Sequence, residues 1–265
     1  MLNAWVILRK SILMVTRNAD QAFRLSGAIF VLAVFLSAAL NVAMTGSLIV
    51  EPPLFPTFDA NTAPAEMVMT EQDMRASMAL VGGNLIFFIA MSWISVSWHR
   101  FVLLEEVTSH PFPSWTAGRV LRYFGIAILA TVGLAFVVVI PFVMAIGFVS
   151  ALGLSVLVPL VSIAMLICFY YLFFRIGLIL PATALDQRMP VAQSFQDTKP
   201  LSDEIWGIAM MVVFASLIAA VLIGMIAPNN ILGVLITALV QWFMVMVSAS
   251  LLTTLYGHCI ERRQL

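Results

Sequence analysis

The chain contains few charged residues. They make up 10% of its 265 residues, whereas apolar residues make up 62%. A soluble domain carries about a quarter of its residues as charges, because its surface faces water. This chain could not cover its surface in water, so lipid is the expected solvent. The formal net charge of zero argues against nucleic acid as a partner, since nucleic-acid binding relies on an excess of basic residues.

Residues suited to metal or nucleophile chemistry are also scarce. Cys168 and Cys259 are the two cysteines, whereas disulfides and metal sites need paired or clustered thiols at set spacings. His99, His110 and His258 are the three histidines, and no two of them have the H-x-x-x-H spacing of a helical metal site. The sequence also lacks a G-x-S-x-G elbow and a phosphate-binding glycine loop. We therefore expect no metal, no cofactor and no catalytic activity.

Long apolar runs dominate the rest of the sequence. A helix needs about 20 residues to cross about 30 Å of hydrocarbon. Runs of this length predict six transmembrane helices, at 27–50, 77–99, 123–149, 152–174, 205–227 and 231–256. Short links near Ser150 and at 228–230 predict that spans three and four, and spans five and six, form antiparallel hairpins. The predicted fold is an all-α polytopic membrane protein with one transmembrane domain, 27–256, and a tail at 257–265.

The basic residues are distributed unevenly about these spans. Cytoplasmic loops of membrane proteins carry an excess of Lys and Arg near the span ends. Twelve of the thirteen Lys and Arg residues fall on one side of the six spans, and only Arg75 falls on the other. The twelve are Arg9, Lys10, Arg17, Arg24, Arg100, Arg119, Arg122, Arg175, Arg188, Lys199, Arg262 and Arg263. This pattern predicts that both termini are cytoplasmic, and we expect the membrane to be the bacterial inner (plasma) membrane.

Residues 1–26 have the pattern of an amphipathic helix, because apolar residues recur at three- and four-residue spacing. The apolar face is made of Trp5, Leu8, Ile12, Val15, Ala19 and Ala22. The polar face is made of Arg9, Lys10, Arg17, Asn18, Gln21 and Arg24. A helix of this kind lies in the plane of the lipid headgroups. We expect an interfacial helix that either anchors the first span or acts as an elbow helix or a docking surface for a partner.

The middle of each predicted span lacks Asp, Glu and Lys. This disfavours a proton-coupled carrier, because such a carrier needs a titratable group along its path. Asn41, Asn84 and Gln241 are neutral polar residues within the spans. We interpret them either as hydrogen-bonding contacts between helices or as contacts to a ligand.

Small residues at four-residue spacing predict close-packed helix faces, since small side chains let helix backbones approach each other in lipid. One such row, in the first span, is Ala33, Ser37, Asn41 and Thr45. Another, in the fifth span, is Ser216, Ala220 and Gly224. We expect Gly224→Leu to destabilise the fold by disrupting the second face.

The ends of the second and fourth spans are similar. Trp98 to Leu104 and Phe174 to Leu180 each place an aromatic residue and an Arg before further apolar residues. This similarity favours three repeated units, each an amphipathic segment followed by a helical hairpin. Arg100 and Arg175 are then expected at the inner interface. Their long stems either snorkel to headgroup phosphates or form a positively charged ring that holds a lipid headgroup or an anionic ligand.

Two segments carry a resemblance to a known family. The segment from Trp98 to Glu106, and the segment 178–199 with its Leu-Ile-Leu-Pro-Ala start, resemble those of uncharacterised bacterial six-helix inner-membrane proteins. That set is similar to the membrane domain fused to some glycerophosphodiester phosphodiesterases. The sequence contains no match to the catalytic domain of those enzymes. The resemblance therefore implies a membrane location rather than their activity.

Three functional interpretations remain open from the sequence. The first is a membrane protein without catalytic activity that acts through membrane lipids or through a protein partner at its cytoplasmic loops. The second is a transporter membrane subunit, such as an exporter-type ABC permease, whose loops dock an ATPase. The third is an enzyme acting on lipid headgroups, with Arg100, Arg175 and Glu105 at the interface.

Overall fold

The computed structural model describes residues 3–47, 70–107, 113–226 and 231–264, and its regular structure there is entirely helical. Within these ranges, six helices are long and apolar enough to cross a membrane. They are α2 (Ala19–Thr45), α3 (Glu71–Leu104), α4 (Ala117–Ala151), α5 (Val158–Ile176), α8 (Ser202–Ile226) and α9 (Ile231–Cys259). The predicted all-α membrane fold with six spans is confirmed. Each predicted span overlaps one of these helices, although residues 48–50 and 227 lie outside the described part of the chain.

Shorter helices connect or flank the spans. They are α1 (Ala4–Arg17), α6 (Ile179–Ala184) and α7 (Val191–Asp197), with 3₁₀ turns at Ser155–Leu157 and Lys199–Leu201. The longest spans, α3 and α4, have 34 and 35 residues. At about 1.5 Å per residue they measure roughly 50 Å, which is longer than the hydrocarbon core. Their ends therefore extend past the hydrocarbon core.

The N-terminal segment forms two helices rather than one. α1 ends at Arg17, and Asn18 separates it from α2. The residues of α1 that are buried are Ile7, Leu8, Ser11 and Val15, and they face α8 and α9. Trp5 remains 56% exposed, so it does not belong to this buried face. The amphipathic pattern of 1–26 therefore divides between a short helix packed on the bundle and the first turns of α2.

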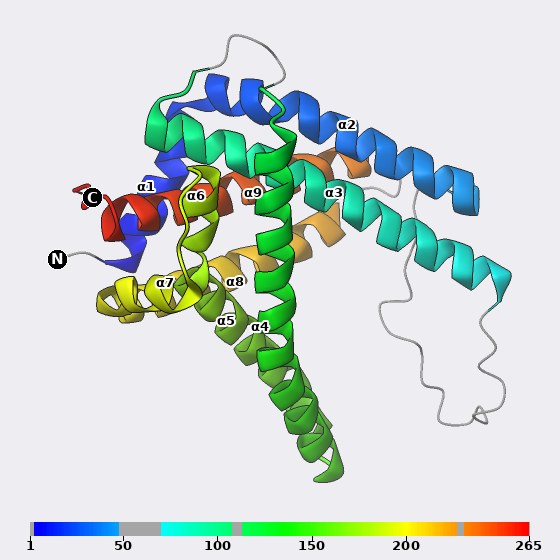
Figure 1. Cartoon of the computed structure of the whole chain (residues 1–265). Coiled ribbons are helices and arrows are strands. Elements are labelled where there is room, and N and C mark those ends of the chain that lie inside the picture. Colours follow the sequence, from blue (N-terminus) through cyan, green and yellow to red (C-terminus); the bar gives the residue numbers. More distant parts are fainter. Residues whose placement is uncertain (1–2, 48–69, 108–112, 227–230, 265) are drawn as a thin grey trace.

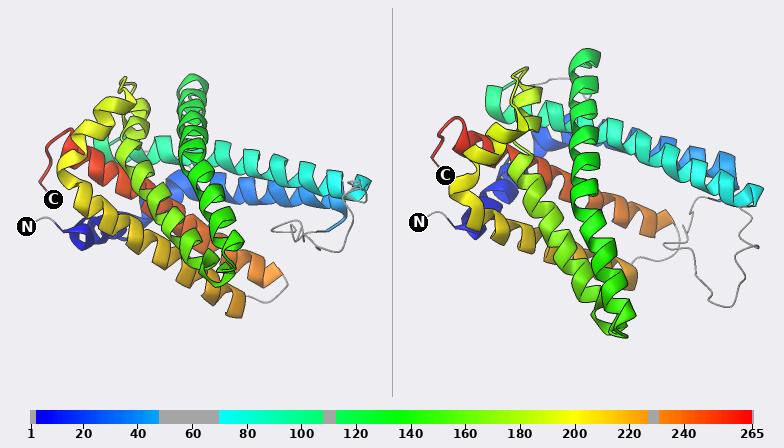
Figure 2. Two further views of the ribbon diagram at one scale, coloured as in Figure 1. Left: turned by 90° about the horizontal axis from the view of Figure 1, so that it is seen from below. Right: turned by 60° about the horizontal axis from the view of Figure 1, so that its bottom comes forward.

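The long helices pair as hairpins that diverge from a shared end of the bundle (Figure 1). α2 packs along α3, and α4 packs along α5. α8 and α9 run in opposite directions between these two pairs (Figure 2). We call the end that carries α1, α6, α7 and both termini the base. The predicted pairing of spans three and four in a hairpin is confirmed, with 3₁₀ turn Ser155–Leu157 in the connection.

The core is concentrated at the base, around the last turns of α9. Leu251, Leu252, Leu255 and Tyr256 are each no more than 4% exposed. α9 contacts α1, α3 and α6 there, so side chains on all its faces are covered by protein rather than by lipid. Burial on every face explains why apolar side chains occur all round these last turns of α9 instead of along one stripe.

Hydroxyl groups on the same turns of α9 join it to its neighbours. Trp98 Nε1 of α3 donates to Ser250 Oγ at 2.9 Å. The hydroxyl oxygens of Ser11 in α1 and Thr254 in α9 lie 3.0 Å apart. In a membrane such polar groups need a protein partner, because hydrocarbon offers none. These contacts therefore fix the register of α1 and α3 against α9.

The two predicted rows of small residues have different outcomes. In the first row, Ser37 Oγ donates to the Gly83 carbonyl of α3 at 3.4 Å, and a Cβ atom at Gly83 would lie 3.7 Å from Ser37 Cβ. This close approach of α2 and α3 agrees with the prediction. In the second row, a Cβ atom at Gly224 would meet no atom within 4 Å. The predicted packing at Gly224 is wrong, because no helix in the described part of the chain covers that position of α8.

Two glycines of α8, Gly207 and Gly224, provide a matched test of the packing of α1 on α8. A Cβ atom at Gly207 would lie 2.7 Å from the Cβ atom of Ala4, which cannot rotate away. We expect Gly207→Ala to destabilise the protein by about 1–3 kcal/mol, the usual cost of overpacking. Gly224→Ala should leave stability unchanged or raise it slightly, since Ala favours helix. Thermal unfolding of both variants in one detergent checks this, and equal melting temperatures would contradict the packing of α1 on α8.

Candidate functional site

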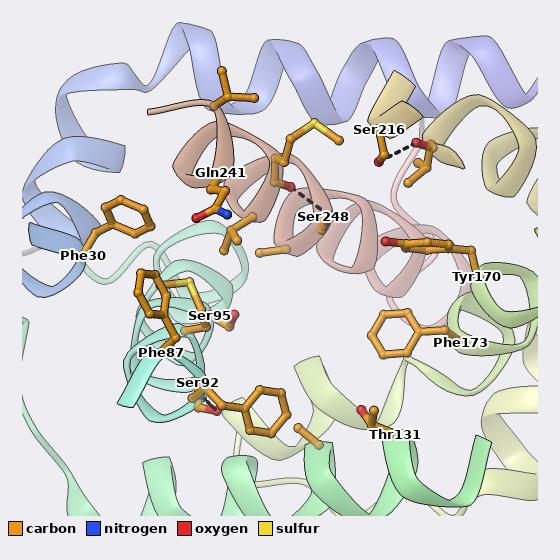
Figure 3. Close-up of a pocket in the computed structure, with 18 of the residues that line it drawn as sticks. Phe30, Phe87, Ser92, Ser95, Thr131, Tyr170, Phe173, Ser216, Gln241 and Ser248 are labelled. Carbon is orange, nitrogen blue, oxygen red and sulfur yellow. Dashed lines mark hydrogen bonds between the residues drawn. The ribbon is translucent and has the colours of Figure 1, made fainter. Parts of the chain in front are cut away.

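A cavity of about 1010 Å³ lies between the hairpins (Figure 3). Residues of α2, α3, α4, α5, α6, α8 and α9 line it. Most of the wall is apolar or aromatic, with side chains such as Phe30, Phe87, Met91, Phe173 and Val212. The polar residues of the wall are Asn84, Ser92, Ser95, Tyr123, Thr131, Tyr170, Ser216, Thr237, Gln241 and Ser248. An apolar cavity with a few polar groups is the usual form of a small-molecule site.

Helical spacing explains how these residues reach one cavity. On α3 the lining residues are Asn84, Phe87, Phe88, Met91, Ser92 and Ser95. They recur at three- and four-residue intervals, which places them on one helix face. α9 contributes a second such stripe, which contains Thr237, Gln241, Met244, Ser248 and Leu252. The α3 stripe mixes aromatic and polar side chains, the α9 stripe mixes aliphatic and polar side chains, and both face the cavity.

The structure brings together two of the three predicted intramembrane polar residues. Asn84 of α3 and Gln241 of α9 both line the cavity, and both side chains are exposed there. Asn41 is not among the lining residues, and its carbonyl accepts a hydrogen bond from Thr45 Oγ1 at 2.7 Å. The geometry at Asn84 and Gln241 suits a ligand contact better than a contact between helices.

The cavity wall carries no Asp, Glu, Lys or Arg among the residues that the structure describes. Over the same residues, no group of three or more His, Cys, Asp and Glu side chains could hold a metal ion. An isolated charge is costly to bury in an apolar site unless it meets an opposite charge. The wall is therefore suited to an uncharged molecule.

A buried histidine lies beneath the cavity. His99 is fully buried, with Nδ1 2.7 Å from Thr253 Oγ1 and Nε2 3.2 Å from the Tyr123 hydroxyl. Tyr123 itself lines the cavity, as does Ser95. In the sequence, His99 stands out only as one of three histidines that lack the spacing of a helical metal site. Thr253 lies 154 positions away, and nothing in the local pattern of either helix indicates that they meet.

Arg100 lies at the base and is held by protein groups. It forms two hydrogen bonds with the Glu106 carboxylate and donates to the Ala184 carbonyl at 3.0 Å. Asp186 lies 3.7 Å away and also binds Arg119, at 2.8 Å. These ion pairs link the end of α3, the start of α4 and the residues that follow α6. A second, polar cavity of about 500 Å³ lies beside Arg100 and Arg119.

Arg175 is buried rather than extended toward headgroups, since it is only 3% exposed. Its guanidinium donates to Thr198 Oγ1 at 2.9 Å, to the Tyr171 hydroxyl at 2.7 Å and to the Phe195 carbonyl at 2.7 Å. It also stacks over the Phe195 ring, 3.9 Å from the ring centroid. The expected snorkelling of Arg175 does not occur, because α7 and the start of α8 fold over it. Its bonds hold these elements to the end of α5.

No protein-family model, curated protein or solved structure matches the chain. The resemblance carried by Trp98 to Glu106 and by 178–199 therefore stays a prediction.

The base ion pairs predict how stability depends on pH. The hydrogen bond from Arg119 holds the pKa of Asp186 below its usual range, and the bond from Arg100 does the same for Glu106. A lowered pKa in the folded state stabilises the protein above the unfolded pKa, and this stability is lost as the pH falls through the folded pKa. We expect the melting temperature to fall below about pH 4, and to fall less in Asp186→Asn.

Glu105→Gln is the matched control for this prediction. Glu105 is adjacent to Glu106, yet it makes none of the ion pairs found in the described part of the chain. Its pH profile of melting temperature should match that of the parent protein. A parent profile that stays flat down to pH 3 would contradict the stabilising role of these pairs. Asn is suitable at 186 because that residue has a φ of 60°, which Asn tolerates.

Proposed function

We propose that this chain is an integral protein of the bacterial inner membrane that binds a lipid-class amphiphile between its hairpins. The observation that supports this best is the uncharged cavity of about 1010 Å³ inside the six candidate spans. Ligand sites commonly enclose roughly 300–1,000 Å³, so the cavity has room for a long acyl chain. Surrounded by lipid, such a space is most readily filled by a molecule with apolar chains.

The composition of the cavity wall supports ligand binding rather than catalysis. Its aromatic residues Phe30, Phe87 and Phe173 offer apolar surface, and Asn84 and Gln241 offer amide hydrogen bonds. This combination matches a molecule with an apolar chain and a small polar group. Beneath the wall, both nitrogens of the nearest histidine already contact Thr253 and Tyr123, so it is not a free base.

A transporter membrane subunit is the second candidate, and the surface of α7 favours it. Val191 and Phe195 of this short helix are 51% and 41% exposed. Apolar residues on an exposed helix at the base suit a protein partner such as an ATPase. The cavity would then hold the transported molecule. A stoichiometric ATPase that co-purifies with the chain would favour this candidate over a binding role alone.

Cysteine labelling tests the proposed orientation, which rests on the gathering of Lys and Arg at the base. In a background of Cys168→Ser and Cys259→Ser, we would compare Gln264→Cys with Glu71→Cys. Both positions are exposed, and they lie at opposite ends of the bundle. A membrane-impermeant maleimide added to intact spheroplasts should label Glu71→Cys. It should label Gln264→Cys only after permeabilisation, and the reverse pattern would overturn the cytoplasmic placement of the termini.

Filling the cavity tests the proposed ligand site. Gly224 lines the cavity, and a side chain there would meet open space. We expect Gly224→Phe to weaken saturable binding of C16 amphiphiles by about tenfold or more, a loss of roughly 1.4 kcal/mol. Equilibrium binding of radiolabelled hexadecanol, methyl hexadecanoate and hexadecanoate to the purified full chain in nanodiscs measures this.

Gly147→Phe is the matched control for cavity filling. Gly147 is an exposed glycine of α4 with open space around it, and it does not line the cavity. Its binding should equal that of the parent. Ala220→Phe places the same ring at another lining position of α8. Unchanged binding in both Gly224→Phe and Ala220→Phe would contradict the site, as would the absence of saturable binding in the parent.

A further inference from the structure

The hydroxyl protons of the cavity serines are already used within their own helices. Ser92 Oγ donates to the Phe88 carbonyl at 2.7 Å. Ser216 Oγ donates to the carbonyl of residue 212 at 2.8 Å, and Ser248 Oγ to that of residue 244 at 2.8 Å. Figure 3 shows these serines around the cavity on different helices. Because a hydroxyl has one proton, each serine presents only lone pairs to the cavity.

The Tyr123 hydroxyl, which also lines the cavity, is paired with the buried histidine beneath it. Thr253 Oγ1 donates to the Ala249 carbonyl at 2.8 Å, so its lone pair accepts the Nδ1 proton of His99. His99 Nε2 is then an acceptor and takes the proton of the Tyr123 hydroxyl. Tyr123 thus also presents only lone pairs to the cavity.

From this arrangement we propose that the cavity selects an uncharged amphiphile whose polar group donates a hydrogen bond, such as a long-chain alcohol or an acylglycerol. The inference rests on the proposed function, since it names the class of ligand for the same site. Ser92, Ser216 and Ser248 accept from such a donor without losing any hydrogen bond of their own. The amides of Gln241 and Asn84 both donate and accept, so they serve the oxygen of the same hydroxyl group.

Anionic and donor-free ligands are disfavoured by the same wall. A carboxylate or phosphate only accepts hydrogen bonds, so it gains one from Ser92, Ser216 or Ser248 only if that serine breaks its bond to a helix carbonyl. The donors that remain in the described wall include the two amides and the hydroxyls of Thr131, Tyr170 and Thr237. The described residues of the wall also offer no cation, and a buried charge without a partner is costly. Arg100 and Arg119 lie at the second cavity, not at this one.

A series of C16 ligands with one chain length tests the selectivity on the full chain in nanodiscs. Hexadecanol has a hydroxyl donor, methyl hexadecanoate is neutral without a donor, and hexadecanoate at pH 8 is an anion. We expect hexadecanol to bind at least about tenfold more tightly than either of the others. Equal affinity for all three, or tightest binding of the anion, would overturn the selectivity and leave the proposed function intact. No saturable binding of any of them would overturn both.

Serine replacement assigns the selectivity to the wall. In the triple variant Ser92→Ala, Ser216→Ala and Ser248→Ala, the preference for hexadecanol over the methyl ester should shrink to about threefold or less. Ser162→Ala is the matched control, because Ser162 donates to the Val158 carbonyl at 2.9 Å in α5 but does not line the cavity. Its preference should equal that of the parent. A triple variant that folds, as its unchanged melting temperature would show, and keeps the full preference contradicts the assignment.

Discussion

A polar group inside a membrane has to find its partner within the protein, because hydrocarbon supplies none. The base of this molecule is organised by that constraint. α9 carries Ser250, Thr253 and Thr254 in its last turns, and each meets a polar side chain of another helix. Apolar side chains of α9 fill the spaces between these bonds. One helix thereby positions α1 and α3, and through His99 and Tyr123 it also positions α4.

The rest of the architecture follows from a difference in hydrogen bonding. Polar groups at the base have protein partners, whereas some polar groups along the spans do not. Arg175 and Arg100 have their hydrogen bonds satisfied by protein groups, so α5, α6 and α7 are tied to the base. Farther along the spans the hairpins diverge (Figure 1), and such bonds between helices become few. Asn84 and Gln241 are the amides left facing open space there. The cavity therefore lies where these two amides are available to form hydrogen bonds with a ligand.

The sequence alone was sufficient for the six spans, because hydropathy depends on the span itself and needs no knowledge of its neighbours. It also singled out Asn84 and Gln241, since polar residues in apolar runs are easy to recognise. It could not distinguish the row Ala33 and Ser37, which packs on α3, from the row at Gly224, which lines a cavity. Both rows have the same spacing. They differ only in that a neighbouring helix packs on the first row, whereas the second row faces the cavity.

Contacts between distant positions were missed for a related reason. The environment of His99 is set by Thr253 and Tyr123, and that of Arg175 by Thr198 and Phe195. A periodic pattern places a residue on a face of its helix, but it does not say what covers that face. For Arg175 the usual behaviour of Arg near a span end predicted exposure to headgroups, whereas the fold of α7 buries it.

A density map of the full chain in a lipid nanodisc tests most directly whether the space between the hairpins is a ligand site. The structure predicts that α3, α8 and α9 stay apart along their middle turns. It also predicts an elongated density between them, with its polar end near Gln241 and its chain beside Phe87. A map in which α8 closes on α3, so that Ser216 packs directly against Phe87 and no density separates them, would contradict the proposed site.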